Sequence, residues 1–356
     1  MLRPLVGRTI ALVLVLAQFF LLLGTADAAA PSDFAIPGGR FYTQANGQGG
    51  VGGTGYAIVD ANESLAPFGL NFISFDSSFR AAGGVSRLGF PASRLTVFPD
   101  FPIQVCQKLV LQYQPGKGVF FLNTFDILHD RGFDAFLDSV RSIPPPFDTS
   151  PDAQLPNFAA VVARHQGFLN ADPAIKALYF SVADPVTQFG LPMSTKDYGN
   201  VFVVRSQRAA FQHWRMDVGP NKANTVTIVN GGDIGKEVGL FPPASVVPEG
   251  PPSSSGDIVV LDPGAGQIVK SGFTVDGYAR LFEAAGAWEL KNVAGQVIAS
   301  GTFMAVSGTS STFAHYAFIV AFMTTVSLPA TLTVFSTSPK DGARINVVNV
   351  PLTLSP

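Results

Sequence analysis

The side chains able to catalyse a reaction are few in this chain and stand far apart. The four histidines are His129, His165, His213 and His315, and the single cysteine is Cys106. The sequence contains neither the H-E-x-x-H spacing of a zinc site nor the G-x-S-x-G surroundings of a hydrolase nucleophile. A lone thiol within an apolar strand is more often a small core residue than a nucleophile. The chain has no recognisable catalytic set, and we expect a protein that is not an enzyme.

An acidic stripe is the best candidate for a metal site. Asp126, Asp130, Asp134 and Asp138 recur at every fourth position. On one helix they would share a face that could hold a hard cation. Gly132 interrupts the stretch, however, and such a stripe is more often a solvated surface. We therefore expect no metal.

A glycine-rich segment at 47–52 spells G-x-G-x-x-G. The dinucleotide fingerprint requires a strand before these glycines and a helix after them. Here a strand-like run at 56–59 follows instead, so we expect no nucleotide and no other cofactor.

The charge balance excludes one class of partner. The chain has 356 residues, of which 23 are basic and 25 acidic, for a net charge of -2. Nucleic-acid binding needs a basic surface, so we expect no nucleic-acid partner. Charged residues make up only 13% of the chain, against about 25% in an average domain. The stretch 292–339 contains none, which fits exported strands whose outer faces carry Thr and Ser.

The first 28 residues have the pattern of a secretory signal peptide. Two arginines precede an apolar run at 10–23, and the small residues Ala26 and Ala28 form a cleavage site. The run is shorter than the about 20 residues of a spanning helix. A later apolar run, Tyr316–Val326, is shorter still, and we expect no transmembrane span in the mature chain. We predict secretion or cell-surface localisation, with retention of the leader as an anchor as the alternative.

A Gly-x-Pro turn followed by a strand occurs twice. The turn at Gly89–Pro91 recurs 101 residues later at Gly190–Pro192, which indicates an internal repeat. In both copies the strand closes on amide and aromatic side chains: Gln112, Tyr113, Gln212, His213 and Trp214. Carbohydrate-binding surfaces often combine an exposed aromatic face with an amide, so these five are candidate ligand-binding residues. The alternative is that they pack inward, because aromatic side chains usually serve as core.

Periodic patterns place the repeats in an α+β region. Alternating apolar residues predict strands at 103–110, 201–205 and 209–214. Helical spacing predicts a helix through 133–140, which prolines at 144–146 end. A second helical region at 155–182 contains Asp172, an N-cap in front of Pro173.

The last part of the chain has a different pattern. The composition of 247–256 (VPEGPPSSSG) predicts a linker. From residue 257 onward, short strand-like runs recur at intervals of about 8–12 residues, which is typical of a β-sandwich. We expect Trp288 in the core between the sheets and a hairpin turn at Lys340–Gly342.

Two families resemble these segments. The first repeat spells Leu88-Gly89-Phe90-Pro91, and the second varies it at Phe189–Pro192, so both resemble the LGFP repeat, which is associated with holding exported proteins at the bacterial cell wall. Residues 257–354, through Ile268–Gly277 (IVKSGFTVDG) and Leu332–Gly342, resemble the immunoglobulin-like domain of bacterial spore-germination and envelope proteins. That resemblance implies a β-sandwich without a known active site.

The expected fold is multidomain: an N-terminal α+β region with two repeats, then an all-β immunoglobulin-like sandwich. The predicted segments are a signal peptide (1–28), two LGFP-like repeat regions (29–147 and 148–246), a linker (247–256) and the sandwich (257–356). We expect a secreted or cell-surface, non-catalytic protein that binds or scaffolds at the envelope, with cell-wall polysaccharide or an envelope protein as partner. The alternative is an exported hydrolase acting on wall polysaccharide or peptide, with its site in the N-terminal region.

Overall fold

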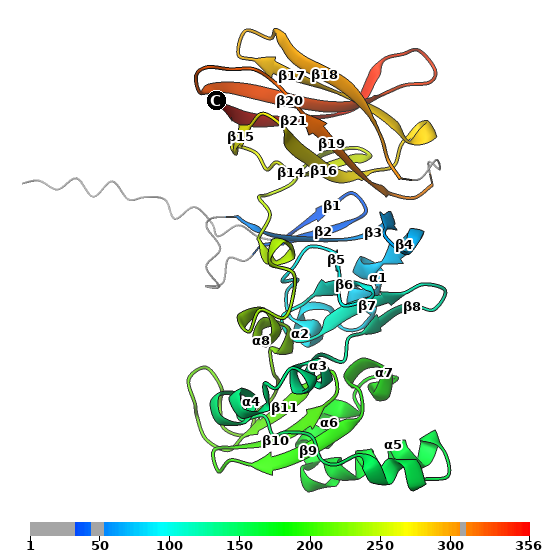
Figure 1. Ribbon diagram of the computed structural model, residues 1–356, viewed down its shortest axis with the longest axis vertical. Coiled ribbons are helices and arrows are strands. Elements are labelled where there is room, and N and C mark those ends of the chain that lie inside the picture. The colour runs from blue at the N-terminus through cyan, green and yellow to red at the C-terminus, as the bar shows by residue number, and fades with distance from the viewer. Residues whose placement is uncertain (1–32, 44–52, 307–310) are drawn as a thin grey trace, which may run out of the picture. The chain divides into compact units, whose positions relative to one another are not determined.

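The computed structural model describes residues 33–43, 53–306 and 311–356. The predicted signal peptide and the glycine-rich segment 47–52 lie outside the described residues. Residues 31–356 form one compact unit, in which a mixed α+β part precedes an all-β sandwich (Figure 1). Within the described ranges, no helix combines the length and the apolar character needed to cross a membrane.

The described chain opens with antiparallel strands. They are β1 (Phe34–Ile36), β2 (Gly39–Thr43), β3 (Gly55–Leu65) and β4 (Gly69–Ser74). Their inward side chains share a buried cluster with the sandwich, made by Ile36, Phe41, Ala57, Val59, Ala61, Val259, Leu261 and Tyr278. The backbone N–H of Asn62 in β3 also donates to the carbonyl of Phe313 at 2.8 Å. These first strands therefore share a core with the C-terminal sandwich.

Two α+β units follow, one for each copy of the repeat. The first contains α1 (Phe75–Ala81), α2 (Gly84–Leu88), β5 (Thr96–Val97), β6 (Pro102–Val105), β7 (Val110–Gln114), β8 (Gly118–Phe121) and α3 (Thr124–Asp130). The second contains α6 (Pro173–Tyr179), α7 (Pro185–Phe189), β9 (Pro192–Asp197), β10 (Val201–Ser206), β11 (Ala210–Trp214), β12 (Val226–Ile228) and α8 (Gly231–Glu237). Between them lie α4 (Asp134–Arg141), η1 (Ser150–Gln154), α5 (Phe158–Gln166) and η2 (Gly167–Ala171). Each unit holds one four-stranded antiparallel sheet, so the internal repeat is a repeated fold.

The Gly-x-Pro turn has the same geometry in both copies. Gly89 has φ 75° and ψ 177°, and Gly190 has φ 76° and ψ 178°. The residue after each glycine donates its N–H to a glutamine side chain, that of Gln107 at 3.1 Å and that of Gln207 at 3.0 Å. A Cβ on either glycine would lie 2.6 or 2.7 Å from the Cβ of that glutamine. Both the backbone angles and the close approach therefore require glycine.

Replacing Gly89 or Gly190 with alanine should lower the free energy of unfolding by about 2–3 kcal/mol, because this backbone region is confined to glycine and the new methyl group collides with the glutamine. Gly199→Ala is the matched control, since Gly199 has φ 87° but nothing within 4 Å of its Cβ position. The control should cost only about 1 kcal/mol of backbone strain. Urea denaturation compares the variants, and equal losses at all three sites would show that the glutamine contact plays no part.

The closing helix of each copy packs on the other copy. Phe125 in α3 of the first copy donates its N–H to the carbonyl of Gln207 in the second, at 3.0 Å. Asp233 in α8 of the second copy donates its N–H to the carbonyl of Gln107 in the first, at 3.1 Å. A Cβ at Gly232 would lie 1.9 Å from a backbone oxygen of the first copy, so glycine allows this approach. The two copies are interlocked rather than independent.

The structure confirms some of the local predictions and corrects others. The strand predicted at 103–110 is instead a tight hairpin in which β6 ends at Val105 and β7 begins at Val110, opposite it. Alternation has the same period in both arms of a hairpin, so it does not show where the chain reverses. The acidic stripe is divided between α3 and α4, with Gly132 at φ 81° between them. Asp172 is the predicted N-cap, since its side chain accepts a hydrogen bond from the N–H of Ile175 at 2.9 Å.

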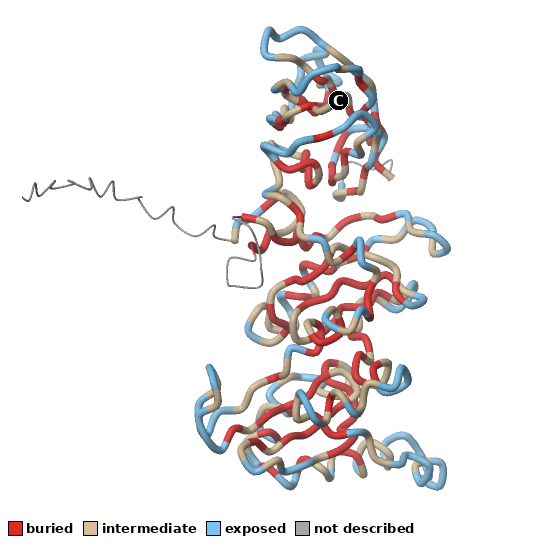
Figure 2. The backbone as a smooth tube through the Cα atoms, turned by 60° about the vertical axis from the view of Figure 1, so that its left-hand side comes forward, coloured by how far each residue is buried: buried red, intermediate tan, exposed pale blue. Residues whose placement is uncertain are grey.

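Two sheets form the C-terminal sandwich. The first contains β13 (Ser253–Ser255), β14 (Ile258–Asp262), β16 (Phe273–Ala279) and β19 (Ala314–Val320), and it continues from β19 into β3 and the other N-terminal strands. The second contains β15 (Ile268–Lys270), β17 (Ala285–Asn292), β18 (Val297–Met304), β20 (Leu328–Thr337) and β21 (Arg344–Ser355). A short turn of 3-10 helix, η4 (Phe282–Ala284), precedes β17. Trp288 lies in the core as predicted and stacks on Phe318 at 5.4 Å. Gly342, at φ 73°, closes the predicted turn between β20 and β21. Buried residues follow the strands, whereas many connecting loops are exposed (Figure 2).

The composition of the segment 247–256 predicts a linker, but the segment forms hydrogen bonds with β3 and with the sandwich. Glu249 and Gly55 exchange two backbone hydrogen bonds, at 2.9 and 2.8 Å, and β13 pairs with β14. Just before it, η3 (Pro243–Val246) accepts a hydrogen bond at the carbonyl of Val246 from the hydroxyl of Tyr56, at 2.6 Å. Backbone groups make most of these contacts, which is why an apolar periodicity does not reveal them.

Candidate functional site

The residues predicted to bind a ligand are mostly buried. Gln112, Tyr113, Gln212 and Trp214 are each 8 or 9% exposed, and His213 is half-buried. The Tyr113 hydroxyl donates to Asn71 at 3.2 Å, and the Trp214 indole N–H donates to Thr227 at 3.0 Å. Of these candidates, Gln212 lines a surface groove. Their burial favours the alternative in which the aromatic side chains close the repeats and pack inward.

The histidines and the cysteine do not converge on one site. Each histidine pairs with a different carboxylate: His129 with Asp134, His165 with Asp152, His213 with Asp172 and His315 with Asp276. Cys106 is fully buried, and burial raises the pKa of its thiol far above the usual range. Within the described part of the chain, no group of three or more histidine, cysteine or acidic side chains is placed to hold a metal ion.

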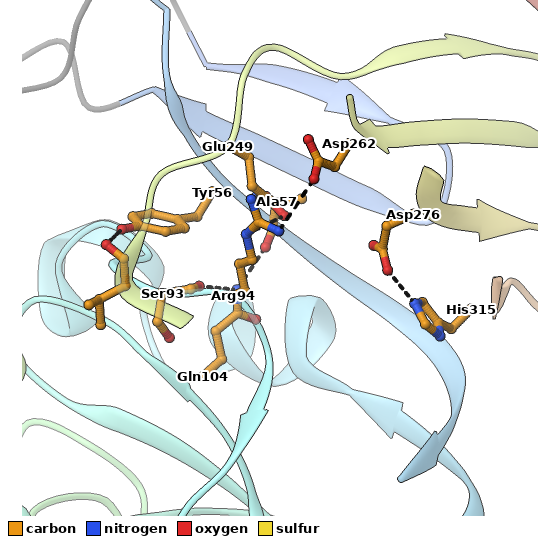
Figure 3. Close-up of polar contacts among 10 residues, drawn as sticks. Tyr56, Ala57, Ser93, Arg94, Gln104, Glu249, Asp262, Asp276 and His315 are labelled. Carbon is orange, nitrogen blue, oxygen red and sulfur yellow. Dashed lines mark hydrogen bonds and ion pairs between the residues drawn. The ribbon is translucent and has the colours of Figure 1, made fainter. Parts of the chain in front are cut away.

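A polar cavity of about 230 Å³ lies where four segments of the chain meet. Its walls come from β3, from the first repeat, from the segment 247–256 and from the sandwich. The polar side chains that line it are Glu63, Arg94, Gln104, Glu249, Asp276, Tyr278 and His315. Figure 3 shows Arg94 between Glu249 and Asp262, with His315 bonded to Asp276. We call these lining residues, together with Asp262, the junction.

Glu249 is a deeply enclosed carboxylate of the junction, at 4% exposed. One of its oxygens accepts a hydrogen bond from the N–H of Ala57 at 3.1 Å, and the other lies 3.4 Å from Nε of Arg94. Burial raises the pKa of Glu249 to about 7, although the charge of Arg94 opposes the shift. Burial thus disfavours the ionised form of this carboxyl group, and the contacts with Ala57 and Arg94 favour it.

A second cluster in the junction centres on His315. Its Nε2 lies 2.8 Å from Asp276 and its Nδ1 lies 3.8 Å from Glu63, which also accepts a hydrogen bond from the Tyr278 hydroxyl at 2.7 Å. Burial disfavours the charged imidazole, but the hydrogen bond to Asp276 and the charges of both carboxylates outweigh it, so the pKa of His315 is raised. Burial likewise raises the pKa of Glu63. The cluster therefore favours a protonated His315 between two acidic groups.

The geometry of the junction favours cohesion between segments. Its volume is below the about 300–1,000 Å³ of ordinary ligand pockets. The described residues that line it include no serine, cysteine or lysine that could act as a nucleophile. The partners of Glu249 lie on β3 and on the first repeat, whereas His315 is bonded to Asp276 within the sandwich and lies 3.8 Å from Glu63 of β3.

Sequence reasoning missed the junction. Glu249 stands in a stretch rich in Pro and Ser, and His315 stands in an apolar run, so neither had a neighbour in sequence that signalled a site. Asp276 and Tyr278 are two residues apart in β16 and so lie on the same face of the strand. This spacing is the one local signal that a polar pair could point toward another element. Bringing these residues to Glu63 requires the long-range pairing of β3 with β19.

The family comparison concerns the sandwich. Residues 257–343 match the family model Gmad2, the immunoglobulin-like domain of bacterial spore germination. The resemblance seen in the sequence of the sandwich is thereby confirmed for those residues. A solved structure, the crystal structure of CopC from Methylosinus trichosporium OB3b, aligns with 29% of this chain and 94% of its own length, at 16% identity and a TM-score of 0.20. No curated protein matches the chain.

Proposed function

We propose that this protein is a non-catalytic binding scaffold of the bacterial envelope. Its interlocked repeats supply the binding surface, and the immunoglobulin-like sandwich is held to them through the junction. The leader predicted at residues 1–28 supports export, and the match of 257–343 to a domain of bacterial spore germination supports an extracytoplasmic role. The resemblance of the repeats to LGFP repeats supports attachment to the cell wall.

The observation that carries this proposal is that charged groups of the junction pair across different segments of the chain. Arg94 of the first repeat lies between Glu249 and Asp262, and Tyr278 and His315 of the sandwich both approach Glu63 of β3. Groups paired in this way across segments join parts of a protein, whereas a catalytic carboxylate needs access to substrate. The alternative, a wall hydrolase, would draw support from a deep cleft where an aspartate, His129 or His165 and Cys106 converge. Instead the two histidines pair with different aspartates, and Cys106 is fully buried.

Co-sedimentation with isolated cell walls tests the proposal. Residues 29–356 are mixed with purified walls and centrifuged, and an acidic globular protein of similar size serves as the control. We expect the protein to pellet with the walls while the control remains in the supernatant. Complete recovery of the protein in the supernatant would refute attachment to the envelope.

A further inference from the structure

A groove of about 610 Å³ lies between the two repeats. Its polar lining comes from both copies: Ser86, Arg87 and Lys108 of the first, and Gln212, Asn221, Thr227 and Asn230 of the second. Leu178 and Ile228 add apolar surface. Two cations, three amides and two hydroxyls thus share one open surface, and no carboxylate is among the described residues that line it.

The two cations of the groove have no acidic partner among the described residues. Lys108 donates to the backbone carbonyl of Ser86 at 2.7 Å, and Arg87 donates to the hydroxyl of Ser181 at 2.9 Å. Neither forms an ion pair with a carboxylate among the residues that the structure describes. Partial burial lowers the pKa of Lys108, because its ammonium group has lost water without gaining an opposite charge. Asp233 lies beyond Asn230 and accepts a hydrogen bond from its amide at 3.2 Å.

In the second repeat a side chain closes the equivalent position. Arg208 is the equivalent of Lys108, and it donates to the backbone carbonyls of Val186 and Thr187 and, at 2.7 Å, to the side chain of Asn123. Asn123 precedes α3 as Asn230 precedes α8. The longer arginine therefore reaches across its site to Asn123, the residue that precedes α3. The hydrogen bond that Lys108 forms is to Ser86, so the space in front of Asn230 stays open as the groove.

We propose that this groove binds an anionic glycan, with a phosphate or carboxylate group of the sugar chain held by Lys108 and Arg87. The amides of Gln212, Asn221 and Asn230 can donate to and accept from sugar hydroxyls, and the apolar patch suits the less polar face of a sugar ring. This inference rests on the proposed function and deepens it, because it names the part of the envelope that is bound. Charge complementarity selects the ligand class, since a cationic surface without carboxylates attracts anions.

Titration calorimetry with defined oligomers tests the groove directly. The probes are a glycerol-phosphate oligomer, a uronic-acid oligomer, a neutral glucan of similar length and inorganic phosphate, each at low salt and at 0.5 M NaCl. We expect at least one anionic oligomer to bind, and to bind more weakly in salt. Binding of one anionic oligomer but not the other identifies phosphate or carboxylate as the recognised group. Equal binding of the neutral glucan, binding of inorganic phosphate as tight as that of the oligomers, or no binding of either anionic oligomer would overturn the proposal.

Charge-neutral variants assign the binding to the groove. Lys108→Gln should weaken binding of the anionic oligomer at least tenfold, and Gln212→Ala should weaken it several-fold. Lys117→Gln, which removes the same charge from an exposed turn of the same repeat, should change it less than twofold. Thermal melting confirms that each variant folds, and unchanged binding by folded Lys108→Gln would overturn the assignment.

The outcomes separate this inference from the proposed function. If the protein pellets with walls but neither anionic oligomer binds, the envelope role stands and the groove assignment fails. If the oligomers bind through Lys108 but walls do not retain the protein, the groove stands and the envelope role fails.

Discussion

Replacing Arg205 with methionine should lower the free energy of unfolding by about 3–5 kcal/mol. Arg205 lies in β10 of the second repeat and its side chain has no solvent exposure. It donates to the carboxylate of Asp134 at 2.8 Å and to the carbonyls of Phe125 and Pro144 at 2.6 and 3.0 Å. One guanidinium thus holds α3, α4 and the proline segment against the second sheet. Methionine fills much of the same space but leaves these acceptors without their donor.

Arg215→Met is the matched control for that experiment. Arg215 pairs with Asp197 at 3.0 Å, but both side chains are about half exposed, and such surface pairs contribute about 0–1 kcal/mol. Guanidinium chloride denaturation measures both variants. A loss at Arg205 no larger than that at Arg215 would show that the buried arginine does not join the two repeats.

The folded protein should become more stable as the pH falls from 8 to about 5. A carboxyl whose pKa is raised by folding binds its proton more tightly in the folded state than in the unfolded chain. The pKa of Glu249 is about 7 in the folded protein, against an ordinary value of 4.5. The ionised carboxylate therefore lowers the free energy of unfolding above pH 7, and this loss disappears as the pH falls toward 4.5. The shift corresponds to at most about 3 kcal/mol. His315 has the same sign, because its raised pKa gives stability that is lost as the pH rises through that value.

Below about pH 4 the trend should reverse. Glu289 pairs with Arg344 and Lys291, and the hydrogen bonds from these two side chains lower the pKa of Glu289 to about 2. Its contribution is present above the unfolded pKa and is lost as the pH falls toward 2. Stability should therefore pass through a maximum near pH 5.

Glu249→Gln isolates the role of the junction. The glutamine side-chain oxygen can still accept the hydrogen bond from Ala57, but the group no longer titrates. We expect the variant to lose the part of the slope in melting temperature between pH 8 and pH 5 that Glu249 contributes, whereas Glu237→Gln, which removes the carboxylate of an exposed pair with Arg141, should retain the full slope. If the melting temperature of the wild-type protein fell as the pH was lowered from 8 to 5, that result would contradict the assigned pKa shifts.

Local patterns predicted the parts of this fold that local chemistry determines. Asp172 with Pro173, the turn at Lys340–Gly342 and the burial of Trp288 follow from capping, turn geometry and apolar periodicity. The repeated Gly-x-Pro turn showed that two similar units exist. Local patterns could not predict the contacts between distant segments. The packing of α3 and α8 on the opposite copies depends on such contacts, for example the close approach of Gly232 to the backbone of the first copy.

The candidate site shows the same division. The sequence drew attention to aromatic and amide residues at the end of each repeat, and of these Gln212 reaches the groove. Lys108 and Arg87 had no pattern to single them out, because a cation becomes notable only when the folded chain leaves it without an acid. The junction residues were hidden for the same reason, since Glu249 and His315 meet their partners only through long-range pairing.

A single time course shows whether the protein binds the envelope without altering it. Residues 29–356 are incubated with purified envelope fragments, and the bound protein, soluble reducing sugars and soluble amino groups are measured together over several hours. We expect the protein to sediment with the fragments, and we expect soluble products not to rise above those of a sample without protein. Release of sugars or peptides in proportion to the protein added would contradict it and would favour an exported hydrolase.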